Sequence, residues 1–393
     1  MGIGSTDPNE EDHGAGRPVP APRHPRSPGR LRSALLAGGI ALVVLLAGYT
    51  LYSVESTPPA TLLVYTYDSL LGGACGANTT AFRPFEAAYH VTLRFECPPN
   101  GLASTLIAEK SAPVADLVVG LDEITGPQAE AAGVLQPYTP PGLANVSPAL
   151  VDGISTDHTV APYEWGYLGI DSCPAFENAT GGASAAFSFP TVAANATWAR
   201  NLIVENPIVD PTGTEFLVWE IQFYSQVLHE GWTPFWTHVA PLETNASSWS
   251  DAFYNDFTCE PHTPGMVVSY LTDPAADASL SPPVPISSSV SWWNGTAYGW
   301  KTIYGVGIVR GSHHLALDEA FENWMLSGAL QSQLPTTEWM YPANTTVALP
   351  AIFADAPNPS LVQPLNAGVT PAQIAEELPG WLDTWQATVA PSG

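Results

Sequence analysis

One uncharged segment, residues 33–54, divides this chain into parts that must fold in different surroundings. The segment is apolar and long enough to cross a hydrocarbon core of roughly 30 Å as a helix. Five arginines precede it, whereas Glu55 is the first charged residue after it. Because cytoplasmic flanks are enriched in Arg and Lys, we predict a single transmembrane helix over residues 33–54, with the N-terminus in the cytoplasm and the rest outside.

A cleaved signal peptide is the alternative, since it too joins a basic region to an apolar one. The apolar run is longer than a signal core, and Ala47-Gly48-Tyr49 is a poor cleavage site, so we favour a retained anchor. Residues 1–32 are rich in Pro, Arg and Gly and are predicted to form a disordered cytoplasmic head. Residues 55–60 read as a linker, which leaves residues 61–393 as the folded extracellular part.

The charge of the chain restricts its partners. Its formal net charge is −26, and Lys110 and Lys301 are its only lysines. Such a surface repels phosphate backbones, which excludes nucleic acid as a partner. The field outside the apolar segment favours cations. The alternative explanation of the charge is general solubility or adaptation to an acidic or salty habitat.

The cysteines and the glycosylation sequons agree with an extracellular location. Four cysteines in an oxidising compartment favour two disulfides over a metal site. Asn-x-Ser/Thr sequons, which a glycosylating exterior would use, begin at Asn78, Asn145, Asn178, Asn195, Asn245, Asn294 and Asn344.

Hydrophobic periodicity predicts an alternating strand and helix pattern after residue 60. Strands are expected over residues 61–67, 91–95 and 115–120, with helices over 82–89 and 103–109 between them. This alternation implies a parallel α/β sheet. Further strands are expected at 163–170, 201–204, 265–270 and 304–309, and helices at 215–229, 315–326 and 372–388.

Polar residues at the ends of these strands form the first candidate site. In open α/β sheets ligands bind beyond the carboxyl ends of strands, which brings Tyr67, Asp68 and Ser69 close to Asp122. The alternative is that the two aspartates only cap the following helices. Thr212, Gly213 and Thr214 open another helix and are suited to an anion such as phosphate, with ordinary capping as the alternative.

These segments resemble, in order, the thiamine-binding proteins of ABC-type uptake systems. The similarity covers roughly residues 60–390, and its most specific block is Pro335–Pro342. The other matching blocks are 65–69, 115–122, 161–167, 206–214, 249–253, 269–275 and 347–350. The resemblance implies a two-lobed, type II periplasmic-binding-protein-like α/β fold, with lobe 1 at about residues 61–160 and 290–393 and lobe 2 at about 161–289.

The resemblance also implies a binding site between the lobes. Its polar residues are Asp68, Ser69 and Asp122, and its phosphate-binding residues are Thr212, Gly213 and Thr214. Its aromatic residues are Tyr67, Trp249, Tyr270, Trp339 and Tyr341. Stacking and cation–π contacts suit the cationic rings of thiamine. The sequence departs from the family pattern in the turn after Asp210-Pro211 and at Asp273, where a small uncharged residue is more usual.

We therefore predict a monomeric, membrane-anchored solute-binding protein, without cofactor or metal, that captures thiamine or a thiamine phosphate and delivers it to an ABC permease in the same membrane. Cys75 is expected to pair with Cys97, and Cys173 with Cys259, because each pair then stays within one lobe. Another cation such as ferric iron is the alternative ligand. A cysteine-dependent thiaminase is the alternative activity, and it requires a free thiol in the cleft.

Overall fold

The computed structural model describes residues 59–73, 75, 80–155, 157–181, 187–283 and 285–390. These residues belong to one compact unit, Pro59–Gly393. The predicted cytoplasmic head, transmembrane helix and most of the linker lie outside the described residues. Among the helices that are described, none combines the length and the apolar character needed to span a bilayer.

The first lobe is built on the predicted alternation of strands and helices. β1 pairs in parallel with β2 on one side and with β3 on the other. All five residues of β3 are buried, as expected for a strand covered on both faces. The elements of this lobe are β1 (Ala60–Tyr65), η1 (Leu70–Gly72), η2 (Thr80–Phe82), α2 (Arg83–Tyr89), β2 (Val91–Glu96), α3 (Leu102–Ala108), β3 (Leu117–Leu121), α4 (Thr125–Ala132), β4 (Leu135–Gln136), η3 (Pro141–Asn145), α5 (Pro148–Ile154), α13 (Leu315–Met325), α14 (Gly328–Gln331), α15 (Leu334–Thr337) and β13 (Tyr341–Pro342).

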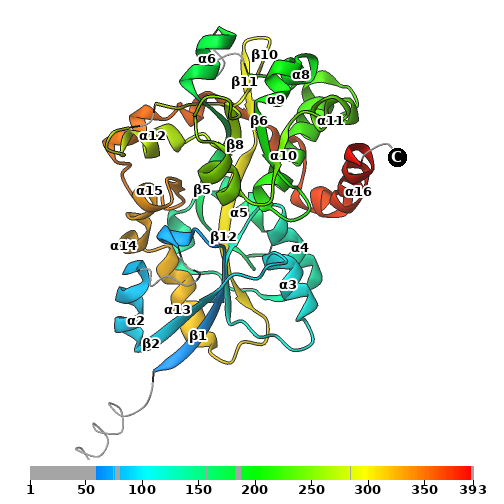
Figure 1. Ribbon diagram of the computed structural model, residues 1–393. Coiled ribbons are helices and arrows are strands. Elements are labelled where there is room, and N and C mark those ends of the chain that lie inside the picture. Colours follow the sequence, from blue (N-terminus) through cyan, green and yellow to red (C-terminus); the bar gives the residue numbers. More distant parts are fainter. Residues whose placement is uncertain are drawn as a thin grey trace, which may run out of the picture. The chain divides into compact units, whose positions relative to one another are not determined.

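Two long strands, β5 (Ala161–Ser172) and β12 (Lys301–Val309), connect the lobes (Figure 1). They pair antiparallel with each other. β12 also runs antiparallel to β3 in the first lobe, while the second half of β5 pairs antiparallel with β8 in the second. The sheet is therefore mixed rather than wholly parallel, because a strand that returns between lobes runs against its neighbours.

The second lobe continues the same sheet. β8 is followed by β6 and β7, which are parallel to one another. The predicted helix 215–229 begins earlier, at Pro211, and passes into a π-helical stretch at residue 223. The elements are α6 (Pro174–Thr180), α8 (Phe189–Ala194), α9 (Ala196–Arg200), β6 (Leu202–Glu205), α10 (Pro211–Gln222), η4 (Phe223–Leu228), α11 (Thr233–Val239), β7 (Thr244–Ala246), η5 (Asp251–Asp256), β8 (Met266–Tyr270), α12 (Asp273–Ala278), β9 (Ser287–Ser289), β10 (Ser291–Trp293), β11 (Thr296–Gly299), η6 (Ala351–Asp355), η7 (Pro359–Leu361), β14 (Val362–Pro364), η8 (Leu365–Gly368) and α16 (Pro371–Val389).

The hydrophobic cores assign the C-terminal segment differently from the sequence analysis. Residues 290–393 were expected in lobe 1. However, Ile374, Leu378 and Trp385 of α16 belong to the buried core of the second lobe, where Trp385 meets the ring of Trp236 on α11. The apolar stripe of this amphipathic helix is buried only if it packs on another apolar surface, and α11 provides that surface. Only the part of the segment that includes α13, α14 and α15 lies with lobe 1.

The predicted disulfides are confirmed. Cys75 pairs with Cys97 and Cys173 with Cys259, which uses all four cysteines of the sequence. One sequon is not suited to glycosylation, because Asn344 is buried and its amide donates to the carbonyl of Leu326. Asn78 lies outside the described residues. The other five sequon asparagines, which are 145, 178, 195, 245 and 294, are exposed, and their glycosylation stays a prediction.

Candidate functional site

Tyr67 lies at the centre of a hydrogen-bonded group in the first lobe, close to the crossing strands. Its hydroxyl is 3.0 Å from the hydroxyl of Tyr163, 3.3 Å from Oε1 of Glu164 and 2.9 Å from Oε2 of Glu338. The backbone N–H of Leu71 also donates to Glu338. Tyr163 and Glu164 come from β5, whereas Glu338 directly follows α15. We call Tyr67, Tyr163, Glu164 and Glu338 the Tyr67 group.

Burial changes the acidity of this group. It raises the pKa of the Glu164 carboxyl well above its usual range, and the nearby Glu338 carboxyl raises it further. Burial likewise raises the pKa of Glu338 to about 7, although bonds from Tyr67 and from the Leu71 amide oppose the shift. Two acids so close together resist carrying charge at the same time.

A line of aromatic side chains leads from the Tyr67 group into the second lobe. The rings of Tyr67 and Tyr304 lie 5.8 Å apart between centroids, and the Tyr304 hydroxyl is 2.7 Å from that of Tyr270. The Tyr270 hydroxyl is 3.5 Å from Oγ1 of Thr212, and its ring is 6.2 Å from that of Trp249. Tyr67, Tyr270 and Trp249, three of the five predicted aromatic residues, are thus brought together across the two lobes.

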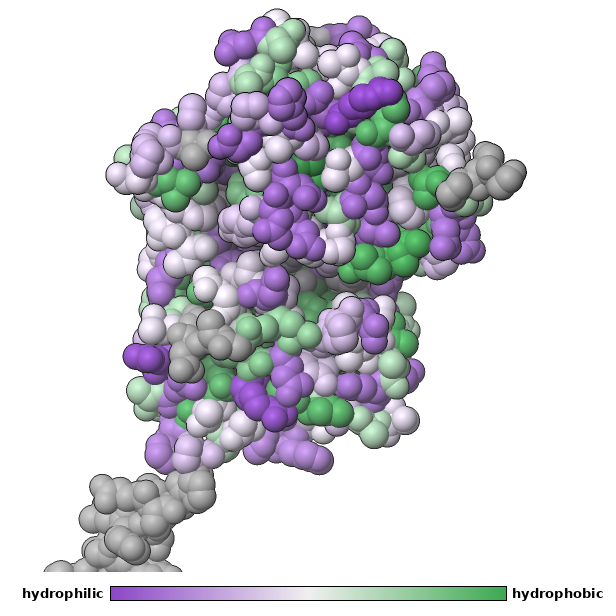
Figure 2. Space-filling model, in the orientation of Figure 1, coloured by the Kyte–Doolittle hydropathy of each residue, from purple (hydrophilic) through white to green (hydrophobic). Residues whose placement is uncertain are grey.

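The cleft between the lobes also contains a direct polar contact. Oγ of Ser250, in the second lobe, donates to Oδ2 of Asp68 in the first at 3.2 Å. Asp68 is exposed and Ser69 half-buried, so both lie at the rim. Figure 2 shows the surface hollowed between the lobes, at the level of the crossing strands in Figure 1.

Trp249 is held by two hydrogen bonds. Its indole N–H donates to Oγ of Ser269 at 2.9 Å, and its backbone N–H donates to Oδ2 of Asp210 at 3.0 Å. Its ring stacks on Phe253 with 5.1 Å between centroids. The Asp273 carboxylate in turn accepts from Ser269 and from the backbone N–H of Tyr270. Asp273, the acidic residue that departs from the pattern of the resemblance, is thus buried. Its carboxylate holds Ser269 and the backbone of Tyr270 instead of facing a ligand.

The backbone N–H groups of the predicted phosphate-binding residues already bond to a carboxylate of the chain itself. Oδ1 of Asp210 accepts from the backbone N–H groups of Thr212 and Gly213, at 2.9 and 3.2 Å. The Thr214 hydroxyl donates to the carbonyls of Pro207 and Asp210. The alternative of ordinary capping therefore describes this helix start. A phosphate would have to displace a carboxylate, against like-charge repulsion.

Asp122 also acts as a cap. Its Oδ1 accepts from the backbone N–H groups of Ile124 and Thr125 and from the Thr125 hydroxyl, at 2.6–2.9 Å. The acid beside it, Glu123, accepts from the indole of Trp300 and the backbone N–H of Ile303. Burial, with the adjacent Asp122 carboxyl as the second cause, raises the pKa of Glu123 to about 8.

Trp339 and Tyr341 make their contacts in a second aromatic set. The ring of Tyr341 stacks on Trp165 at 4.7 Å, and the ring of Trp339 stacks on Phe353 at 6.4 Å. Nζ of Lys301 lies 4.9 Å from the centroid of the Trp165 ring. Strand alternation places Lys301 and Trp165 on the face of the crossing strands opposite to Glu164 and Tyr304. On this face of the crossing strands, Lys301 thus already supplies the cation beside the aromatic rings.

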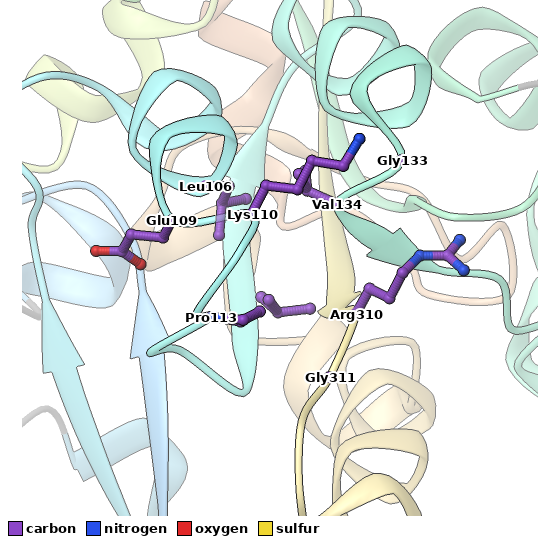
Figure 3. Close-up of a pocket in the computed structure, with 9 residues that line it drawn as sticks. Leu106, Glu109, Lys110, Pro113, Gly133, Val134, Arg310 and Gly311 are labelled. Atoms are coloured by element: carbon purple, nitrogen blue, oxygen red, sulfur yellow. The ribbon is translucent and has the colours of Figure 1, made fainter.

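A surface cavity of about 260 Å³ lies elsewhere on the first lobe, between the ends of α3, α4 and β12. Its charged lining residues are Glu109, Lys110 and Arg310, and Figure 3 shows their charged ends directed away from one another. None of the predicted site residues lines it. We therefore place the candidate site between the lobes.

Four residues complete the cleft without having been predicted as site residues, although all four lie in segments that the sequence pattern had singled out, Glu215 at the start of the predicted helix 215–229. Glu338 falls within the block Pro335–Pro342, Glu164 within Ala161–Tyr167, and Tyr304 opens a predicted strand. The fourth, Glu215 in α10, is fully buried, and its Oε1 accepts from the hydroxyl of Thr302 at 2.7 Å. Acids within apolar segments were the available signal, because a carboxyl is rarely buried without a partner or a function.

The alternative of a cysteine-dependent activity lacks its nucleophile. Every cysteine is paired, so no free thiol is left as a nucleophile. Within the described ranges, no set of three or more His, Cys, Asp or Glu residues is arranged to hold a metal ion.

Comparison with known proteins connects this site to a group of binding proteins. The chain is 26% identical over 331 residues to the thiamine-binding periplasmic protein of Salmonella typhimurium, covering 84% of this chain and 93% of that protein. The protein of the same name from Brucella suis is 25% identical over 357 residues, covering 87% and 97%. No protein-family model matches the chain. The names of these relatives are those of binding proteins, in agreement with the prediction that the chain is not an enzyme.

Solved structures share the fold. A periplasmic thiamin binding protein superposes with a TM-score of 0.70 at 22% identity, over 84% of this chain and 97% of that one. The fructose-6-phosphate-bound protein AfuA from Actinobacillus pleuropneumoniae gives 0.66 at 18%, over 85% and 99%. Ferric ion-binding protein A of Pasteurella haemolytica gives 0.64 at 12%, over 84% and 97%. The chain is thus related in sequence to the thiamine-binding periplasmic proteins, and its described domain has the two-lobed α/β fold of type II periplasmic binding proteins.

Proposed function

We propose that the domain captures thiamine between its lobes and delivers it to an ABC permease. The observation that carries this proposal is the chemistry of the cleft, where aromatic rings meet two buried carboxyls, Glu164 and Glu215, and the half-buried carboxyl of Glu338. The hydrogen bonds of Glu164, Glu338 and Glu215 come from phenols, a hydroxyl and a backbone N–H, and none comes from a lysine or arginine in the part of the chain that the structure describes.

Thiamine is complementary to such a site in each of its parts. Its thiazolium is a permanent cation, which attracts both carboxylates and the faces of aromatic rings. Its aminopyrimidine is flat and donates hydrogen bonds, so it suits a stack on Trp249 or Tyr270 beside an acid. The names of the sequence relatives support the same ligand.

Among thiamine and its phosphates, the arrangement around Asp210 favours the unphosphorylated form. Its carboxylate occupies the two N–H groups that a phosphate needs. We therefore expect the monophosphate and the diphosphate to bind more weakly than thiamine itself.

Anchoring and delivery form the remaining part of the proposal. A transmembrane helix at residues 33–54 would hold the binding domain near the permease through a short linker. Tethering of this kind raises the effective concentration of the domain at its partner. Protease protection of residues 1–32 in sealed vesicles tests the topology, and digestion of that segment from the outside would contradict it.

Titration calorimetry of the full-length protein against thiamine, its mono- and diphosphate and ferric iron tests the ligand. We expect thiamine to bind most tightly. Absence of binding by every thiamine form would refute the proposal, whereas binding of iron alone would favour the alternative ligand.

Two tryptophan variants test the predicted contacts. Trp249→Ala and Trp339→Ala should each weaken thiamine binding by about 1–3 kcal/mol, since each removes an aromatic face. Trp292→Ala is the matched control, because Trp292 is exposed on β10 and lies outside the cleft. Unchanged affinity in both cleft variants would show that these side chains do not contact the ligand.

A further inference from the structure

The three contacts of the Tyr67 hydroxyl require more hydrogen atoms than the phenols of Tyr67 and Tyr163 provide. Tyr163, Glu164 and Glu338 each place an oxygen within 3.3 Å of it. A phenol donates one hydrogen and accepts up to two. Tyr67 and Tyr163 together supply two hydrogens for three oxygen–oxygen contacts, so the third contact needs a hydrogen on one of the carboxyls.

The second oxygen of Glu164 is an independent sign that something is missing. Glu164 is 1% exposed, and its buried Oε2 has no hydrogen-bond partner among the described residues. A buried polar atom of this kind costs roughly 1–3 kcal/mol, and more if it is charged. This cost is small while the carboxyl is neutral. For the charged carboxyl, the cost falls when a cation or a hydrogen-bond donor reaches Oε2.

The groups around the pair do not neutralise it. The β1–η1 connection contributes Tyr67 and Asp68, and η1 contributes the N–H of Leu71. The crossing strands contribute Tyr163 from β5 and Tyr304 from β12. From η5 in the second lobe, Tyr254 lies close enough to Glu338 and Asp68 for their charges to raise its pKa, after burial as the main cause. Lys301 of β12 lies over the ring of Trp165, on the other face of the strand. The neighbours are thus phenols and a further acid.

We propose that Glu164 and Glu338 share one proton in the ligand-free domain, and that a bound cation takes its place. The proton passes to solvent, the two carboxylates then face the positive charge, and the hydrogen of Tyr67 stays on its phenol. This inference rests on the function proposed above and adds proton release to it. It also makes Glu338 a determinant of selectivity for cations over neutral analogues of the same shape.

Calorimetry in buffers of different ionisation enthalpy tests the exchange with thiamine as the probe. At about pH 8, above the pKa of about 7 that burial gives Glu338, we expect nearly one proton released for each thiamine bound, and the release should fall toward zero at higher pH as the pair loses its shared proton. The affinity should rise with pH across this range, by up to about tenfold for each unit. Any titration of thiamine itself is common to all variants, so the comparison between variants isolates the pair.

Glu338→Gln supplies the missing hydrogen permanently from its amide, and so does Glu164→Gln. In each variant we expect proton release near zero, a flat pH profile and weaker binding at high pH. Two variants are used so that loss of folding in one, detected by thermal melting, still leaves the other. Glu322→Gln is the matched control, because Glu322 is equally buried but lies on α13, outside the Tyr67 group.

The outcomes separate the inference from the function on which it rests. Thiamine binding with the same proton release in the wild type and in both variants would overturn the exchange while leaving the function intact. Absence of thiamine binding would overturn both. Loss of proton release in both Gln variants, with wild-type release in Glu322→Gln, is the result we expect.

Discussion

Replacement of Asp210 by Ala tests how the second lobe holds the cleft together. This carboxylate is 9% exposed and accepts three backbone N–H groups, those of Thr212, Gly213 and Trp249. Loss of a helix N-cap costs about 1 kcal/mol. Leaving the N–H of Trp249 without its acceptor adds roughly 1–3 kcal/mol. We therefore expect Asp210→Ala to lower the free energy of unfolding by about 2–4 kcal/mol.

Asp210→Asn separates the two contributions. The amide oxygen still caps Thr212 and Gly213, because Asn is as good an N-cap as Asp. The amide nitrogen, however, cannot accept from Trp249, so this variant should lose only the roughly 1–3 kcal/mol of that bond.

Urea unfolding of the full-length protein, followed by tryptophan fluorescence, measures both losses. Asp152→Ala, an exposed site on α5, serves as the control and should stay within about 0.5 kcal/mol of the wild type. The reasoning is refuted if Asp210→Ala unfolds at the wild-type urea concentration. A second measurement uses the same variants: removal of the carboxylate frees the two N–H groups, so the affinity for thiamine monophosphate relative to thiamine should rise in Asp210→Ala.

Three further predictions follow from burial and packing. Burial raises the pKa values of Glu123 and Glu243 to about 8, so between about pH 4.5 and 8 the folded domain keeps protons that the unfolded chain has lost. The free energy of unfolding should therefore fall as pH rises. A melting temperature higher at about pH 8.5 than at about pH 5 would contradict this. Gly213→Ala should cost about 1–3 kcal/mol in urea unfolding, because a Cβ would lie 2.3 Å from the carbonyl oxygen of Glu205, whereas Gly231→Ala meets nothing within 4 Å and should be neutral. Replacing Cys173 and Cys259 by Ser should destabilise the domain by about 2–4 kcal/mol, since the bond closes a separation of 86 residues, and an unchanged melting temperature would show that the bond adds no stability.

Several features of the protein could be predicted from its sequence. Apolar runs such as that of β1 and the 3.6-residue periodicity of α13 predicted the main strands and several helices of both lobes, because burial of a face imposes its period on the residues. The disulfide pairing was also predicted correctly, since each pair stays within one lobe. The transmembrane segment at residues 33–54 stays a prediction.

The sequence could not show which polar residues face a ligand and which serve the backbone. Asp122 was predicted as a site residue, yet it accepts from N–H groups of its own neighbourhood, as Asp210 and Asp273 do. Asp and Asn form such local bonds wherever a helix starts, so residue type alone does not separate the two roles.

The sequence by itself determined the location of the strands, the excess of acid and the aromatic residues available for a cation. Only the tertiary structure decided that Tyr67 meets Glu164, 97 residues away, and Glu338, 271 residues away. Contacts over such separations depend on how β5 and β12 cross between the lobes, and no local pattern encodes that crossing. The pair of carboxyls around Tyr67 exists because long-range strand pairing brings the buried Glu164 and the half-buried Glu338 to one phenol, where neither has a basic partner among the residues that the structure describes.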